Sequence, residues 1–189
     1  MFDGSFLSLE ENIELTRKVV KEAAKKGVDV EGQVGKIPDR GENINKNFLT
    51  SPQEAAYFVE KTGVSALAIS VGNIHNMAMN EEFTTDIDLL GEINKLTNVP
   101  LVMHGGTGFP DVLVKEVIKR GVCKFNVGGI LRGVFLREIK KTLEKIDLSK
   151  ADFQKLLGSN SQVNIFEKGY SAVEEVVKEK LKLYSSSMI

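Results

Sequence analysis

The stretch 100–108, Pro-Leu-Val-Met-His-Gly-Gly-Thr-Gly, holds the residue types of a metal or anion site. Its three apolar residues, 101–103, predict a short buried strand, and His104 follows where that strand ends. Glycine is used where the backbone turns tightly or a ligand approaches closely, and three of the next four residues are glycine. An imidazole can bind a metal or transfer a proton, and the N–H groups of such a turn can hold an anion such as phosphate. A partly buried histidine beside a glycine-rich turn fits these residues equally well.

Four more polar residues fall at or near the carboxyl ends of predicted strands. They are Asp3, Glu31, His75 and Asn126. In a (β/α) barrel these strand ends, with the loops that follow them, form the active-site face. Packing alone explains five such residues poorly, so the pattern predicts a site. For single residues a structural interpretation stays open: Glu31 could be a buried, paired carboxylate, and Asn126 could cap the turn after it.

Short apolar strands alternate with helices along the chain. Capping-box patterns at Ser8–Glu11 and Ser51–Glu54 begin two of the helices. We expect strands at 28–34, 66–71, 100–104 and 122–127, and helices near 8–26, 51–62, 86–96, 111–120, 131–146, 152–157 and 166–184. The polar segment 35–47 is expected to form an exposed, mobile loop.

This alternation predicts an α/β fold with a parallel sheet wrapped by helices, and the polar strand ends favour a (β/α)8 barrel. A length of 189 residues suits a single domain covering residues 1–189. Only Met1 and Phe2 precede Asp3, so the sequence offers four good strands and one short one, against eight in a closed barrel. We therefore expect a partial barrel that lacks the N-terminal strands.

Composition narrows the classes of partner and location. A net charge of -1 gives no reason to expect nucleic acid as a partner. No stretch approaches the roughly 20 apolar residues that span a bilayer, and the N-terminus does not read as a secretory signal. One cysteine, Cys123, fits a reducing compartment, so we expect a cytoplasmic protein and a packed strand thiol.

Several segments together resemble the class II fructose-bisphosphate aldolase family, which includes the tagatose-bisphosphate aldolases. The segments are Phe2-Asp3-Gly4-Ser5, residues 10–13, 30–35, 51–55 and 72–75, His104-Gly105-Gly106-Thr107-Gly108, and residues 123–127. Their order and spacing match across nearly the whole chain. The match covers only the C-terminal part of the family's length.

The resemblance implies a zinc-dependent (β/α)8 barrel, either a homo-oligomer or a chain complemented by an N-terminal piece. It implies a lyase that reversibly cleaves fructose or tagatose 1,6-bisphosphate into dihydroxyacetone phosphate and glyceraldehyde 3-phosphate. The residues that match the metal site are His75, His104, Asp3 and Glu31. Those that match phosphate- or substrate-binding positions are Gly72, Gly105, Gly106, Thr107 and Asn126.

The chain also departs from the family pattern. The third zinc histidine and a catalytic aspartate of the family lie upstream of Met1, and Gln33 stands where the family has a metal-site glutamate. An amide is a poorer ligand for a dication than a carboxylate. For the loop acid/base, Glu42 and Asp39 are both candidates. The alternatives are therefore a truncated or split half barrel that needs a partner chain, or another sugar-phosphate enzyme on this barrel, such as an isomerase.

Overall fold

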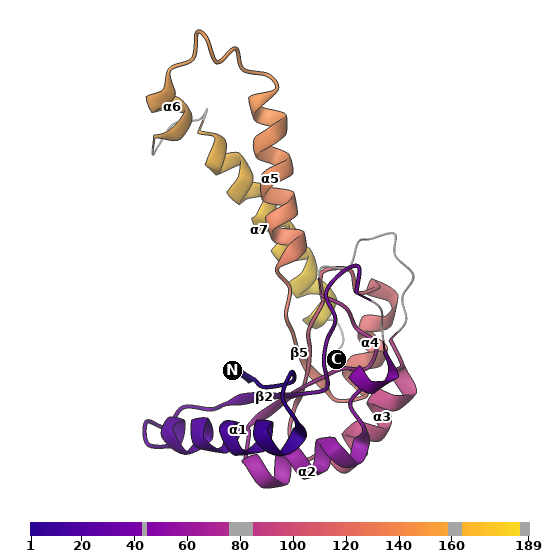
Figure 1. The fold of residues 1–189 in the computed structure, drawn as a ribbon. Coiled ribbons are helices and arrows are strands. Elements are labelled where there is room, and N and C mark those ends of the chain that lie inside the picture. Colours follow the sequence, from indigo (N-terminus) through magenta and orange to yellow (C-terminus); the bar gives the residue numbers. More distant parts are fainter. Residues whose placement is uncertain (43–44, 76–84, 159–163, 186–189) are drawn as a thin grey trace. The chain divides into compact units, whose positions relative to one another are not determined.

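The computed structural model describes residues 1–42, 45–75, 85–158 and 164–185 (Figure 1). Two compact units divide the chain, Met1–Val127 and Gly128–Ile189, and each is described by itself. No helix in the described residues is both long and apolar enough to cross a membrane. The expectation of one domain over residues 1–189 stays a prediction.

The first unit is built on a sheet of five parallel strands whose spatial order equals their order in the chain. The strands are β1 (Phe2–Asp3), β2 (Glu31–Val34), β3 (Ala66–Ile69), β4 (Leu101–Met103) and β5 (Val122–Phe125). The connecting helices are α1 (Leu9–Ala24), α2 (Pro52–Thr62), α3 (Ile87–Leu96) and α4 (Asp111–Lys119), with a short 3-10 turn, η1 (Lys46–Phe48). Right-handed crossovers in sequential order place successive helices on one face, as in a (β/α) barrel. The predicted α/β partial barrel is confirmed.

Helix starts follow the predicted capping chemistry. The Ser8 side chain accepts from the backbone N–H of Glu11, and the Glu11 carboxylate accepts in return from the backbone of Ser8. At α2, the Ser51 hydroxyl accepts from the backbone N–H of Glu54 at 3.1 Å. These bonds satisfy N–H groups that the first helical turn leaves without partners. They fix where the helices begin after β1 and before β3.

The two faces of the sheet differ in chemistry. A Cβ on Gly32 would lie 2.7 Å from the Phe58 ring of α2, so this position faces the helices. Alternation along β2 then puts Glu31 and Gln33 on the opposite face, which we call the inner face. The register pairs Gln33 with Ala68, Ala68 with Val102, and Val102 with Lys124, so all of these side chains share the inner face. The inner face therefore carries charged and amide groups, whereas fully buried apolar side chains such as Leu67 and Leu101 face the helices.

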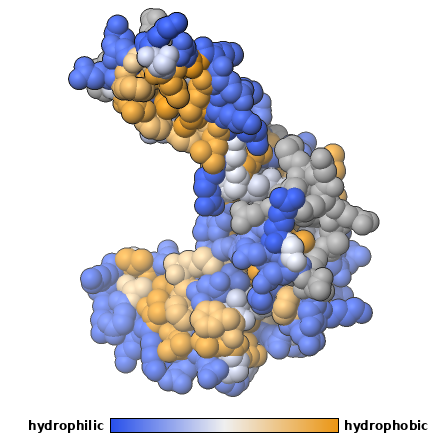
Figure 2. All heavy atoms as spheres, turned by 45° about the horizontal axis from the view of Figure 1, so that its top comes forward, coloured by the Kyte–Doolittle hydropathy of each residue, from blue (hydrophilic) through white to orange (hydrophobic). Residues whose placement is uncertain are grey.

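The second unit consists of α5 (Gly129–Leu143), α6 (Phe153–Leu157) and α7 (Ile165–Ser185). α5 and α7 pack on each other through Phe135, which stacks on Phe166 with ring centroids 6.4 Å apart. A Cβ at Gly169 would lie 2.5 Å from the Phe135 ring, so glycine allows the helices to approach closely. Exposed apolar side chains, including Leu136 and Leu181, gather on this unit (Figure 2).

Two local predictions are wrong. Cys123 is exposed on β5 rather than packed, and its thiol lies 3.5 Å from the carbonyl oxygen of Gly121. The register between β4 and β5 passes from Val122 to Lys124 and leaves Cys123 without a partner on β4, as in a β-bulge. The loop 35–47 is not uniformly exposed, because Ile37 and Pro38 are buried.

Thr50 ties the ends of β2 and β3 together. Its buried hydroxyl donates to the carbonyl of Val34 at 2.6 Å and accepts from the backbone N–H of Ser70 at 2.8 Å. The backbone N–H of Thr50 also donates to the carbonyl of Ser70. These bonds hold the base of the loops that follow both strands.

Replacing Thr50 with valine should lower the free energy of unfolding by about 1–3 kcal/mol, because a buried N–H and a buried carbonyl each lose their partner. Thr50→Ser keeps the hydroxyl and loses only a methyl group, which should cost about 0.8 kcal/mol. Urea unfolding of the two variants measures the difference. Equal losses would show that these hydrogen bonds do not hold the strand ends.

Candidate active site

Glu31 lies at the centre of a cluster on the inner face. Its side chain is only 9% exposed, and both of its oxygens are engaged. Oε1 lies 3.0 Å from Nε2 of His104, which comes from the end of β4, and Oε2 accepts a hydrogen bond from the ammonium of Lys124 on β5. Glu31 and His104 are buried, whereas the side chain of Lys124 is about half exposed, at 52%. Three strands thus contribute one charged or titratable group each to a single cluster.

The charge of Glu31 is stabilised by its partners. Burial by itself raises the pKa of a carboxyl group, but the hydrogen bonds from His104 and Lys124, together with the positive charge of Lys124, outweigh it. The pKa of Glu31 is consequently lowered from its ordinary value. Glu31 is therefore an ionised hydrogen-bond acceptor at neutral pH.

The backbone around His104 is fixed from two sides. Asn73 donates from its side-chain amide to the carbonyl of His104 at 3.0 Å and accepts from the N–H of Val71 at 2.9 Å. On the other side, the N–H of Gly106 donates to the carbonyl of Asn126 at 3.1 Å. The side-chain amide of Asn126 also lies 2.8 Å from Nε2 of His104. The turn after β4 is thus built against the segments that follow β3 and β5.

His75 faces His104 across the strand ends. The two ring centroids are 5.8 Å apart, and the ring planes are inclined by 46°. Nδ1 of His75 lies 3.7 Å from a carboxylate oxygen of Asp39, and the backbone of His75 bonds to Pro38 and Arg40 on the same loop. This contact brings the loop after β2 to the histidine pair.

The pKa of His75 is lowered, first by burial and then by the neighbouring His104, while Asp39 and Asp3 oppose the shift. A lowered pKa keeps the ring neutral at neutral pH, and neutral imidazole is the form that binds metals. His75 is therefore available as a neutral nitrogen donor, with the His104 ring beside it.

The other predicted site residues act on the histidine pair directly or contact a residue that does. Asp3 accepts from the backbone N–H of Ser5 at 3.0 Å, and its charge acts on His75. The Glu42 carboxylate accepts a hydrogen bond from the backbone N–H of Asp39 and forms an ion pair with Lys36 at 3.4 Å. Among the described residues, its polar contacts are therefore with Asp39 and Lys36 and not with a histidine. The glycine and threonine positions among the predictions belong to the turns beside the histidines; they are Gly72, Gly105, Gly106 and Thr107.

Two residues of the cluster were not predicted as site residues. Lys124 forms an ion pair with Glu31. The signal for a site role is its position two residues before Asn126, since alternate residues of a strand share a face. Asn73 follows Gly72 directly, and only its tertiary hydrogen bonds reveal that it holds the His104 backbone.

The donor set fits part of a zinc site. Rings that share one tetrahedral zinc have centroids about 5 Å apart, given zinc–nitrogen distances of about 2.0–2.1 Å. The observed separation of 5.8 Å is close to that value. Among residues 1–42, 45–75, 85–158 and 164–185, no group of three His, Cys, Asp or Glu side chains is arranged to hold an ion. The described residues thus supply two imidazole donors, one fewer than the three protein ligands of a catalytic zinc site.

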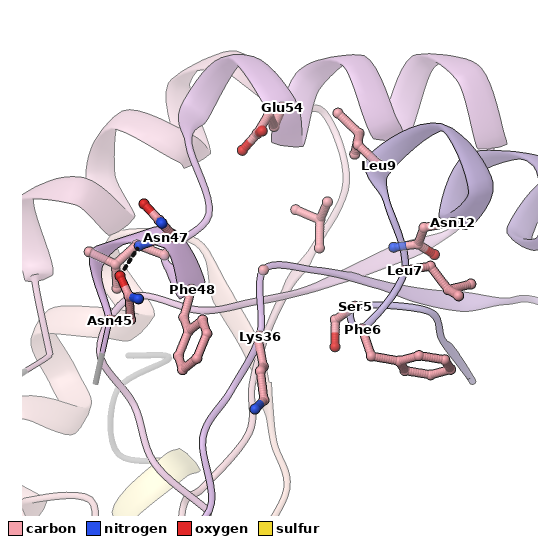
Figure 3. A pocket seen from close by; sticks show the side chains of 13 residues that line it. Ser5, Phe6, Leu7, Leu9, Asn12, Lys36, Asn45, Asn47, Phe48 and Glu54 are labelled. Carbon is pink, nitrogen blue, oxygen red and sulfur yellow. Dashed lines mark hydrogen bonds between the residues drawn. The ribbon is translucent and has the colours of Figure 1, made fainter. Parts of the chain in front are cut away.

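A separate hollow of about 500 Å³ lies beside the loops that follow β1 and β2 (Figure 3). Phe6 and Phe48 contribute aromatic walls, and the Lys36 ammonium lies 4.8 Å from the centroid of the Phe48 ring. Neither histidine lines this hollow. It is therefore distinct from the histidine pair.

Comparisons with known proteins give consistent results. The sequence model of the family "Fructose-bisphosphate aldolase class-II" matches residues 1–188. The chain is 36% identical over 190 residues to a sulfofructosephosphate aldolase of Alkalicoccus urumqiensis, covering 98% of this chain and 62% of that protein. It is 32% identical over 187 residues to a fructose-bisphosphate aldolase of Streptococcus pneumoniae, covering 98% of this chain and 64% of that protein.

A solved structure agrees in fold. The YdjI aldolase of Escherichia coli K12 superposes with a TM-score of 0.74 at 28% identity, covering 99% of this chain and 59% of that one. The chain therefore spans about three-fifths of the length of the proteins it matches. This share agrees with a sheet of five strands, where a complete barrel has eight.

Gly105 should tolerate no side chain. Its φ is +75°, and an added Cβ would overlap the carbonyl oxygen of Ile74, which precedes His75. Gly27 offers a matched control, with φ +62° and no atom within 4 Å of its added Cβ. Gly27→Ala should cost about 1–2 kcal/mol of unfolding free energy from backbone strain alone. Gly105→Ala should cost clearly more in the same denaturation experiment, and equal losses would contradict the close approach of the two turns.

Proposed function

Because the chain belongs to the class II fructose-bisphosphate aldolase family, we propose that its histidine pair serves the reversible cleavage of a phosphorylated ketose. The observation that carries the proposal is the approach of His75 and His104, at 5.8 Å between ring centroids, next to a glycine turn. Both rings follow the carboxyl ends of neighbouring parallel strands, which form the active-site face of a (β/α) barrel.

The substrate class follows from the relatives' names. One relative is named for fructose bisphosphate and another for sulfofructose phosphate, so both names describe a phosphorylated fructose derivative. We propose a substrate of that kind, with fructose and tagatose 1,6-bisphosphate as the first candidates. Their cleavage would give dihydroxyacetone phosphate and glyceraldehyde 3-phosphate. The alternative of an isomerase on the same barrel has no observation in its favour.

Zinc is the proposed cofactor, held by His75 and His104, with Asp3 and Glu31 as the acidic residues of its surroundings. A zinc ion bound there would supply a Lewis acid for the ketone carbonyl of the substrate. The backbone N–H groups of Gly105, Gly106 and Thr107, with Gly72 nearby, would bind and orient a phosphate group. Asn126 would direct its amide to the substrate beside His104.

Asp39 is the better of the two candidates for proton transfer. Its carboxylate lies 3.7 Å from the His75 ring, whereas the Glu42 carboxylate is turned towards the Asp39 backbone and Lys36. The pKa of Glu42 is lowered by its hydrogen bond from Asp39 and by Lys36, which disfavours Glu42 as the proton donor. We therefore assign the proton transfer to Asp39, whose carboxylate lies beside the proposed metal-binding ring of His75.

A second candidate function is that of a catalytically incomplete half barrel that works with a partner. Among the described strands, none pairs with the outer edge of β1 or of β5, although a closed barrel has no free edge. A complementing N-terminal chain, or assembly into a homo-oligomer, would supply the missing strands and a third metal ligand. The cytoplasmic location expected from the sequence stays a prediction.

The decisive experiment measures zinc content and aldol cleavage in the purified chain. We expect zinc to bind and a phosphorylated ketose to be cleaved, either by the chain alone or together with a chain that supplies the remaining strands. Outer-shell partners of a metal ligand are commonly worth 10–100-fold, so His75→Ala and His104→Ala should each lower activity by at least about 100-fold. Gln53→Ala, at an exposed position of α2, is the matched control and should change neither readout.

The two candidate functions give different results. Zinc retention and cleavage by the chain alone support the complete enzyme. Activity that is present only with the complementing chain supports the half barrel, and size-exclusion mass would then show the complex. An absence of both zinc and cleavage, with and without that chain, would contradict the proposed function.

A further inference from the structure

Lys124 reaches across the sheet to Glu31. Glu31 is on β2 and Lys124 is on β5, so two strands lie between them. Neighbouring strands are about 4.8 Å apart, which puts these two backbones about 14 Å apart in a flat sheet. The ion pair therefore depends on a curved sheet and on two long side chains that meet over the inner face.

Small side chains leave the space for this contact. Ala66 is the register partner of Glu31, and Ala68 is in register with Val102, which in turn is in register with Lys124. Larger residues at the two alanines would stand between the carboxylate and the ammonium. The inner face is thus shaped to let Glu31 and Lys124 meet beneath His104, which lies two residues after Val102 on the same face.

The contact determines which nitrogen of His104 carries the hydrogen. An ionised carboxylate only accepts hydrogen bonds, so the nitrogen 3.0 Å from Oε1 of Glu31 must be a donor. That nitrogen is Nε2, and a neutral ring with Nε2–H has its lone pair on Nδ1. His104 then offers Nδ1, and not Nε2, as its donor atom for a metal.

The same reasoning orients Asn126. Its amide lies 2.8 Å from Nε2 of His104, and a nitrogen that donates cannot also accept from an amide N–H. The two ends of an amide exchange by a half-turn, so the carbonyl oxygen of Asn126 should face the ring. Its NH2 group is then turned away from the ring and is available to a substrate oxygen.

We propose that Lys124 is a positioning residue for the metal-binding histidine: by holding Oε2 of Glu31 it directs Oε1 to Nε2 of His104 and so presents Nδ1 to the metal. The inference rests on the proposed function for the role of the metal, but the tautomer of His104 does not depend on it. Without the ammonium, the Glu31 side chain can rotate and the ring loses its single orientation. Lys124 therefore acts through two other residues and need not touch the substrate.

The test compares Lys124→Met with Lys124→Arg in the full chain. Methionine keeps much of the length of lysine without the charge, whereas arginine keeps a cation that can bind Oε2. The first readout is the tautomer of His104, from two-bond 1H–15N correlations of the metal-free protein at a pH where both imidazoles are neutral. We expect a single Nε2–H tautomer in the natural chain and in Lys124→Arg, and a mixture of tautomers in Lys124→Met.

The second readout is the dissociation constant for zinc ions. Lys124→Met should bind zinc about 10–100-fold more weakly, as is usual when the outer partner of a ligating histidine is lost. Lys124→Arg should lie close to the natural chain. Lys115→Met, at an exposed position of α4, controls for the loss of a surface charge and should change neither readout.

A double variant shows whether a change in Lys124→Met comes only from misfolding. Glu31→Gln combined with Lys124→Met removes both charges, which avoids a buried carboxylate without a partner. It should show the same mixture of tautomers as Lys124→Met. A single Nε2–H tautomer in either variant would overturn the proposal.

The result separates this inference from the proposed function. A natural chain that binds no zinc but shows the single tautomer, lost in Lys124→Met, refutes the metal role and supports the role of Lys124. A chain that binds zinc equally well with and without Lys124 keeps the proposed function and overturns the positioning role.

Discussion

The structure of the first unit depends on one buried carboxylate and its two partners. Glu31 is enclosed on the inner face of the sheet, and a buried charge is costly unless it is paired and hydrogen-bonded. His104 and Lys124 meet that requirement, one at each oxygen. Because the three residues lie on β2, β4 and β5 or directly after them, pairing this charge requires a curved sheet that brings these strands together over the inner face.

The candidate site follows from this constraint. The carboxylate holds one side of the His104 ring, and the backbone of that residue is held by Asn73 and by the turn against Asn126. The ring centroid of His104 lies 5.8 Å from that of His75, whose pKa is lowered chiefly by burial. A preorganised pair of rings results from groups that themselves need not bind a ligand. This is the usual relation between a metal ligand and its hydrogen-bonded support.

The parallel sheet and the histidine site could be predicted from the sequence, whereas contacts that depend on the packing of distant strands could not. A histidine at a strand end followed by a glycine-rich turn predicts a binding site, because glycine is used where a ligand approaches the backbone closely. The apolar segments that alternate with helices predict the parallel sheet. The Lys124–Glu31 pair spans 93 residues of sequence, and nothing local indicates which strands are curved enough to bring them together. Cys123 was expected to be packed because its neighbours are apolar, but it is exposed where the register between β4 and β5 is irregular, which local sequence does not indicate. Gln33 is buried with its Oε1 lacking a partner among the described residues, a feature that only the packed structure reveals.

X-ray absorption spectroscopy of the zinc-loaded chain tests the central claim most directly, because it counts the atoms bound to the ion. The account predicts two imidazole nitrogens at about 2.0–2.1 Å, with their number reduced by one in His104→Ala. A first shell without imidazole, or one with sulfur at about 2.3 Å from the exposed Cys123, would contradict the site proposed for His75 and His104.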